Sequence, residues 1–209
     1  MHIAICMDYG NAKYRYCWTY RSLFLCFGLH RSRVGKYQKQ TWKRVAYISI
    51  RMAEYWKIQG DELQDLAMCA LLHDNALTQY ISEELKKDSV IDLKKDLSEE
   101  KTNLHCIYGE KNITKLPFKT DVSNVILYHH EHADGTGPFQ KKWNEIPLFA
   151  RIIHLADIID IIRNSIDSDD NSWDFMCQYL SKNKDSLFDS ECVNAFLSCI
   201  HKRIVYVFK

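Results

Sequence analysis

Histidines and aspartates interrupt apolar stretches of this chain in a pattern that could hold a metal. His73-Asp74 follows the apolar run 66–72, and His129-His130 follows the run 125–128. Asp157 continues a third run, 151–156. Polar groups within a core are unfavourable unless a partner satisfies them, and a divalent metal suits imidazole and carboxylate together. We therefore predict a buried metal site, with His105 as a sixth ligand candidate.

These residue types indicate the metals and the reaction. Imidazole nitrogen and carboxylate oxygen bind Fe, Mn, Zn, Ni or Co, and one aspartate can bridge two ions. Two ions about 3.5–4 Å apart activate water and stabilise the charge of a phosphoryl transition state. We expect one or two divalent transition-metal ions as the cofactor and phosphate-ester hydrolysis as the chemistry.

Each residue alone has a plainer explanation. His105 alone is more often a hydrogen-bonded or exposed histidine, and His129-His130 alone could be a solvated helix end where a charged imidazole complements the helix dipole. Their joint occurrence favours the metal-ligand interpretation.

The segments around these residues resemble the HD superfamily of metal-dependent phosphohydrolases, and within it the HD-GYP branch. Residues 70–74 are similar to the doublet that names the family, 105–109 to its His-x-x-x-Gly motif, and 128–138 to its HHExxDGxGYP motif. The likeness covers roughly residues 38–200 and includes Arg44-Val45-Ala46, Ala53, Ile146-Pro147, 151–160, Phe188-Asp189 and Ala195-Phe196.

The resemblance implies hydrolysis of cyclic di-GMP or a related nucleotide, with Asp74 and Asp157 as the catalytic residues. Asp74 would bridge two ions. One ion would be bound by Asp74, His105, His129 and His130. The other would be bound by His73, Asp74, Asp157 and a histidine of the first helix.

That last histidine is absent. Counting back from Arg44 and from His73 by the family spacing leads both times to Thr41, a poor ligand at neutral pH. His30 lies 11 residues too early, which along a continuous helix is the same face but roughly 16 Å away.

Other family positions have also changed. The lysine that follows the doublet is Leu77, and the arginine after the helix aspartate is Ile166, although Arg163 could turn into the site. The loop motif lacks its tyrosine. Arg163 and Lys141 are the remaining candidates for binding substrate phosphate.

Composition and periodicity favour an all-α fold. Only three prolines and seven glycines among 209 residues argue against a β-sandwich or barrel. We expect an HD-domain bundle of about six to eight helices over residues 38–209 and an extension, 1–37, packed on it. Within that extension, 14–29 should form a helix or hairpin.

Local patterns place the individual elements. Asp61 should cap the second helix, Pro147 should begin the helix carrying Asp157, and Asp160 should orient a histidine. The expected helices are 41–58, 61–74, 121–130, the one after Pro147, 172–184 and 189–206, with a charged connector at 86–103 and a loop at 131–146.

The net charge and the cysteines indicate which ligands and which cellular compartment to expect. A net charge of +1 gives no reason to expect DNA binding, and the apolar run near the start is shorter than the roughly 20 residues of a membrane span. Eight cysteines without any C-x-x-C pair suggest free thiols in the reducing cytoplasm.

Two functions remain open from sequence alone. The first is a metal-dependent phosphodiesterase of the HD-GYP type, with weak turnover because of the changed positions. The alternative is a catalytically degenerate domain that acts as a nucleotide- or protein-binding signalling module. A cyclic dinucleotide or another phosphorylated small molecule is the expected ligand, and a homodimer or a signalling-protein partner stays open.

Overall fold

The computed structural model describes residues 3–9, 12–18, 41–77, 99–165 and 170–199. The chain divides into two compact units, Met1–Lys36 and Tyr37–Lys209. The smaller unit contains an antiparallel hairpin of β1 (Ile3–Tyr9) and β2 (Ala12–Trp18), in which Ile3 pairs with Trp18 and Tyr9 with Ala12. Most of the predicted element at 14–29 lies outside the described residues, and packing of 1–37 on the larger unit stays a prediction.

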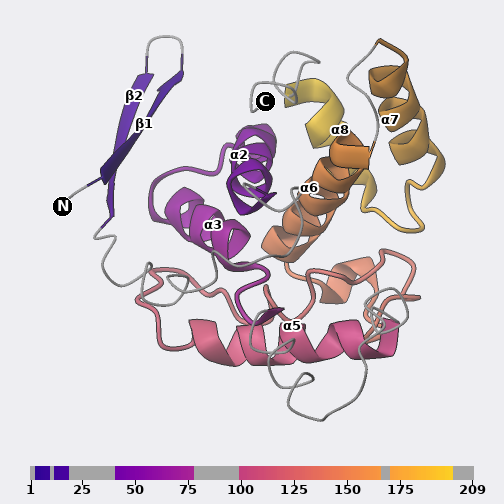
Figure 1. Ribbon diagram of the computed structural model, residues 1–209, viewed down its shortest axis with the longest axis horizontal. Helices are drawn as coiled ribbons and strands as arrows, with labels where there is room; N and C mark the ends of the chain where they lie inside the picture. Colours follow the sequence, from indigo (N-terminus) through magenta and orange to yellow (C-terminus); the bar gives the residue numbers. More distant parts are fainter. Residues whose placement is uncertain (1–2, 10–11, 19–40, 78–98, 166–169, 200–209) are drawn as a thin grey trace. The chain divides into compact units, whose positions relative to one another are not determined.

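The larger unit is helical, which confirms the predicted fold class (Figure 1). Its described residues contain six α-helices and two short 3-10 helices. They are α2 (Thr41–Ala53), η1 (Glu54–Trp56), α3 (Gly60–Leu72), α5 (Glu99–Ile113), η2 (Trp143–Glu145), α6 (Leu148–Ser165), α7 (Asp170–Lys182) and α8 (Ser190–Cys199).

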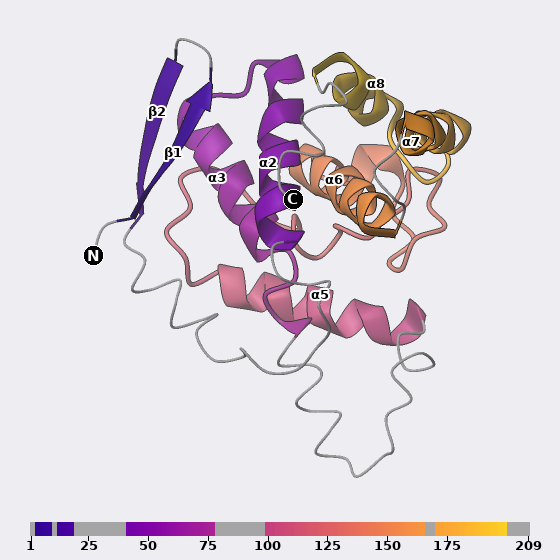
Figure 2. The ribbon, with the colours of Figure 1, turned by 45° about the horizontal axis from the view of Figure 1, so that its top comes forward.

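The core forms where α2 packs against α3 and α6. Val45 and Met52 of α2, Leu66 of α3, and Ile152 and Leu155 of α6 are all completely buried. In Figures 1 and 2, α5 runs beneath the lower ends of these helices. The described residues thus leave the end of α3 facing α5, with α6 alongside.

A buried ion pair joins α2 to α6. Arg44 donates to both carboxylate oxygens of Asp160, through Nε to Oδ1 and through Nη2 to Oδ2 at 2.9 Å. The same Nη2 lies 3.3 Å from the hydroxyl oxygen of Thr41. Asp160 therefore helps to fix α2 on α6 through Arg44, a role that the sequence-based assignment to a histidine did not include.

The start of α3 differs from the prediction. Gln59 occupies the N-cap and makes no side-chain capping bond, while Gly60 takes a positive φ of 63° as the first helical residue. The predicted cap at Asp61 is therefore wrong. Asp61 lies in the first turn, where its carboxylate complements the helix dipole.

Residues 121–130 form consecutive turns instead of the predicted helix. The carboxylate of Glu110 accepts hydrogen bonds from the backbone amides of Asn124 (2.6 Å), Ile126 (3.1 Å) and Leu127 (3.0 Å). Asn124 has a left-handed φ of 64°. Because a side chain from α5 takes these amide protons, they are not available for a regular helical ladder.

The later elements agree better with expectation. The helix carrying Asp157 starts directly after Pro147, whose carbonyl accepts from the amide of Arg151 at 3.1 Å. Helices α7 and α8 match the last two predicted helices, with residues 200–206 outside the described part of the chain. Residues 86–98 of the predicted connector are also outside it, and residues 99–103 belong to α5.

Free cysteines and the absence of a membrane-spanning helix were also predicted from the sequence. The five cysteines of the larger unit, at positions 69, 106, 177, 192 and 199, are not joined in disulfides. Among the described helices, none is long and apolar enough to cross a membrane.

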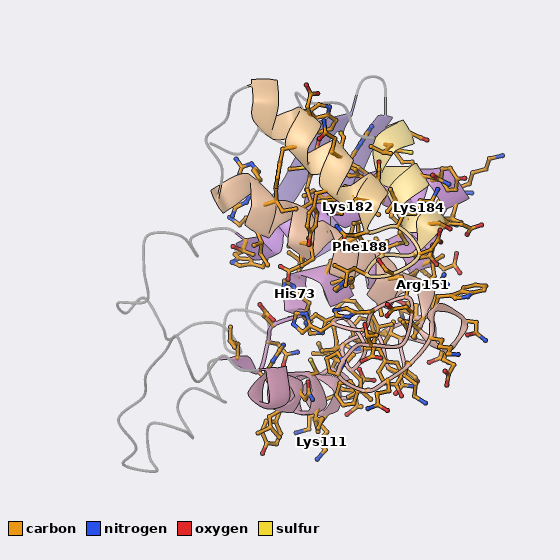
Figure 3. The ribbon with its side chains drawn as sticks, turned by 90° about the vertical axis from the view of Figure 1, so that its right-hand side faces the viewer. His73, Lys111, Arg151, Lys182, Lys184 and Phe188 are labelled. Atoms are coloured by element: carbon orange, nitrogen blue, oxygen red, sulfur yellow. The ribbon has the colours of Figure 1, made fainter. Side chains whose placement is uncertain are left out.

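Replacing Glu110 should destabilise the larger unit. Glu110→Ala removes an ionised acceptor shared by three backbone amides, so we expect the free energy of unfolding to fall by about 2–3 kcal/mol. Lys111→Ala is the matched control, since Lys111 is exposed on the outer side of the same helix (Figure 3) and should change stability by less than about 0.5 kcal/mol. Urea denaturation measures both, and equal effects would contradict the role of Glu110.

Candidate metal centre

Four segments of the larger unit bring the predicted ligands together. His73 and Asp74 follow the last turn of α3, His105 lies on α5, His129 and His130 end the turn segment 121–130, and Asp157 lies on α6. Figure 3 shows His73 between the upper helices and α5. The segments are far apart in sequence, so their meeting depends on the packing of the whole unit.

Asp74 lies at the centre of this cluster. Its Oδ1 is 3.4 Å from Nε2 of His105 and 3.7 Å from Nε2 of His129, and its Oδ2 is 3.4 Å from Nε2 of His73. Donor atoms that share a tetrahedral ion with bonds of about 2.1 Å are about 3.4 Å apart. These separations therefore match those of atoms that coordinate a common ion.

The remaining two candidates extend the cluster on opposite flanks of Asp74. Oδ1 of Asp157 lies 3.6 Å from Nε2 of His73. The ring of His130 is centred 3.9 Å from that of His129 and 5.2 Å from that of His105. The structure thus brings all six predicted ligands together.

Backbone carbonyls orient two of the imidazoles. Nδ1 of His73 lies 2.8 Å from the carbonyl oxygen of Ala70, and Nδ1 of His129 lies 2.6 Å from that of Ile126. Each Nδ1 therefore carries the proton and donates it, which leaves the lone pair on Nε2.

Both of these Nε2 atoms are buried and have no hydrogen-bond partner. An unsatisfied buried nitrogen is unfavourable by about 1–3 kcal/mol. A cation between them and Asp74 would remove this penalty, so the residues fit a metal ion.

The charges in the cluster also favour a cation. Partial burial would by itself raise the pKa of Asp74, but His73 and His129 hold it well below its usual range. Burial likewise opposes charge on His129, yet Cys106 and Asp74 raise its pKa to about 10. The Asp74 carboxylate thus favours positive charge in the site.

Asn75 and Gly109 hold the end of α3 against α5. The Asn75 amide donates to the carbonyl oxygens of Leu72 (2.8 Å) and Gly109 (3.3 Å) and accepts from Nδ2 of Asn112 at 2.9 Å. A Cβ at Gly109 would lie 2.9 Å from Ile126 and 3.1 Å from Asn75, so only glycine allows this approach. The contact brings His73-Asp74 close to His105.

Glu131 shapes the glycine loop that follows the histidine pair. Its buried carboxylate accepts from the backbone amides of Phe139 and Lys141, both at 2.5 Å. A Cβ at Gly137 would lie 2.6 Å from the amide nitrogen of His132 and 2.8 Å from Cα of Glu131. The loop therefore needs both the glycine and the carboxylate.

The residues predicted to bind substrate differ in their surroundings. The ammonium of Lys141 is exposed and lies 3.2 Å from Oε1 of Glu145. Arg163 is half-buried in the last turn of α6, and Leu77 is half-buried just after the doublet. Ile166 and His30 lie outside the described residues. Substrate binding by Lys141 and Arg163 stays a prediction.

Sequence reasoning missed one member of the cluster. Cys106 was not among the predicted ligands, but donor atoms of His105, Cys106, His129 and His130 all lie within 4.8 Å of one another. Burial would raise the pKa of Cys106, yet His129 and His105 lower it to about 7. Its position directly after His105 was the only signal available.

Comparison with known proteins identifies the class. An HD-domain family model matches residues 29–192, and the chain therefore belongs to the HD-domain family. A solved cyclic GMP-AMP specific phosphodiesterase of Vibrio cholerae shares the fold with a TM-score of 0.61 and 22% identity, over 78% of this chain and 44% of that one. An HDG"Y"P protein of Bdellovibrio bacteriovorus does so with a TM-score of 0.55 and 19% identity, over 76% and 50%. The predicted membership of the HD superfamily is confirmed by the family match, and both solved structures share the fold.

Two curated proteins of Vibrio cholerae are similar in sequence. The 3'3'-cGAMP-specific phosphodiesterase 1 is 21% identical over 201 residues, which are 89% of this chain and 43% of that protein. The 3'3'-cGAMP-specific phosphodiesterase 3 is 34% identical over 122 residues, 57% of this chain and 26% of that protein. The chain spans less than half the length of either relative.

Removing the side-chain amide of Asn75 should weaken metal binding by the cluster. Asn75→Ala removes the bonds that join the end of α3 to α5, so we expect metal affinity to fall by about 10-fold or more. Asn112→Ala is the control, because it removes a single exposed bond of the same network. Isothermal titration with Zn²⁺ measures both affinities. An Asn75→Ala protein that binds as tightly as the control would contradict this role.

Proposed function

We propose that this chain is a metal-dependent phosphodiesterase that hydrolyses a cyclic dinucleotide. The observation that carries the proposal is the convergence of imidazoles and carboxylates on Asp74, with two buried Nε2 atoms lacking any hydrogen-bond partner. The names of the curated relatives make 3'3'-cGAMP the first substrate to test, and cyclic di-GMP the second.

The ligand assignment follows the distances. Asp74 lies between two groups and is proposed to bridge them. One group contains His105, His129 and His130, and the other contains His73 and Asp157. When bound, the ions would supply a water of lowered pKa and neutralise charge on the phosphate.

The protein's own residues contribute position and polarity. The backbone carbonyls of Ala70 and Ile126 keep the protons of two imidazoles away from the reacting phosphate. The side chain of Asp74 is 39% exposed, so the cluster is open to solvent on that side. A phosphodiester could reach the centre there, with Asp74 and Asp157 as the proposed catalytic carboxylates.

Thr41 is the observation that favours the degenerate alternative. It begins α2 and lies beside Arg44, which is bound to Asp160 of the helix that carries Asp157. Threonine in this place leaves the group of His73 and Asp157 without the imidazole that the family supplies. We therefore propose that this half of the centre binds its ion weakly and that turnover is slow.

Hydrolysis is tested directly with the whole chain. After the protein is loaded with Zn²⁺, Mn²⁺ or Fe²⁺, we expect it to convert 3'3'-cGAMP to a linear dinucleotide. Chromatography measures this conversion. His129→Ala should reduce the rate at least about 100-fold because it removes a proposed ligand, whereas His132→Gln, in the neighbouring loop, should leave it nearly unchanged. Tight binding of the dinucleotide without any hydrolysis would contradict the enzyme proposal and favour the signalling module.

Restoring the missing imidazole should strengthen metal binding by the group of His73 and Asp157. Thr41→His is expected to raise the metal content from about one tightly bound ion towards two and to increase any hydrolysis rate. Thr41→Ser, which supplies no imidazole, is the control. Two tightly bound ions in the unmodified protein, measured by elemental analysis, would overturn the assignment of Thr41.

A further inference from the structure

We propose that Cys106 supplies a thiolate donor to the metal ion held by His105, His129 and His130. This inference rests on the proposed metal centre and narrows the class of ion that it takes. It concerns a residue of α5 that lies next to His105 and is completely buried.

The distances place the sulfur among the imidazole donors. Sγ of Cys106 lies 3.5 Å from Nε2 of His105, the atom that also faces Asp74. In a tetrahedral site with metal–nitrogen bonds of about 2.05 Å and metal–sulfur bonds of about 2.3 Å, nitrogen and sulfur are about 3.6 Å apart. The observed separation of 3.5 Å therefore suits two ligands of one ion.

Hydrogen bonding to His129 does not account for the sulfur's position. Sγ lies 3.8 Å from Nδ1 of His129, but that nitrogen already donates to the carbonyl oxygen of Ile126 at 2.6 Å. Nε2 of the same ring is buried and has no hydrogen-bond partner. This unpartnered nitrogen is an independent sign that the cluster lacks a cation, and a donor atom of Cys106 lies within 4.8 Å of those of all three histidines.

A thiolate changes which ion the site prefers. Soft sulfur donors favour Zn²⁺ and other late transition metals, whereas Mg²⁺ and Mn²⁺ prefer oxygen. With three imidazoles, the Asp74 carboxylate and one thiolate, the centre should take Zn²⁺, Co²⁺ or Fe²⁺ and should resist competition from Mg²⁺ and Mn²⁺.

Cobalt spectroscopy tests the proposal on the whole chain. Co²⁺ added to the metal-free protein should produce visible ligand-field bands together with a near-ultraviolet charge-transfer band from thiolate to cobalt. In Cys106→Ser and Cys106→Ala the charge-transfer band should disappear, and affinity for Co²⁺ should fall by about 10-fold or more. Cys192→Ser is the matched control, because Cys192 is equally buried but lies on α8, and it should keep both bands.

The outcomes separate this inference from the proposed function. Visible bands without a charge-transfer band in the wild-type protein, or a band that persists in the Cys106 variants, would overturn the thiolate ligand and leave the metal centre standing. Failure to bind Co²⁺, or binding unaffected by His129→Ala, would overturn the centre itself. If both Cys106 variants fail to fold, the wild-type spectrum decides: absence of the band overturns the proposal, and its presence also in Cys192→Ser and Cys69→Ser supports it.

Discussion

The structure depends on the burial of three imidazoles around a single carboxylate. Backbone carbonyls hold the Nδ1 protons of His73 and His129, which directs both Nε2 atoms towards Asp74. Buried nitrogens without partners are tolerated only where some other interaction compensates. A positive ion between imidazole and carboxylate is the compensation that suits all of these groups at once, so the chemistry of the chain follows from an electrostatic requirement of its core.

The supporting contacts all serve to bring three unrelated segments close together. Asn75 ties the end of α3 to α5, and the missing side chain of Gly109 lets Ile126 approach. Glu110 then fixes the turns that precede the histidine pair. These groups bind no metal in our assignment, but they set the distances between the groups that do.

Sequence reasoning succeeded where a local pattern carried the information. Polar residues at the ends of apolar runs, together with the family resemblance, predicted the ligand cluster and the helical fold. It failed where a distant side chain decides the conformation. Residues 121–130 have a helical pattern, but the carboxylate of Glu110 accepts hydrogen bonds from their backbone amides. Similarly, Arg44 forms an ion pair with Asp160, which lies 116 positions later in the sequence. Cys106 was missed because a buried thiol fits an apolar helix face as well as a ligand cluster.

The uneven exposure of the cluster has a kinetic consequence. The side chain of Asp74 is 39% exposed, whereas those of His73, His105 and His129 are at most 2% exposed. An arriving ion therefore meets the carboxylate first and exchanges its waters for imidazole nitrogens only afterwards. Departure follows the reverse order, so Asp74 is the last ligand to be released, and a chelator in solution acts on ions that the imidazoles have already given up.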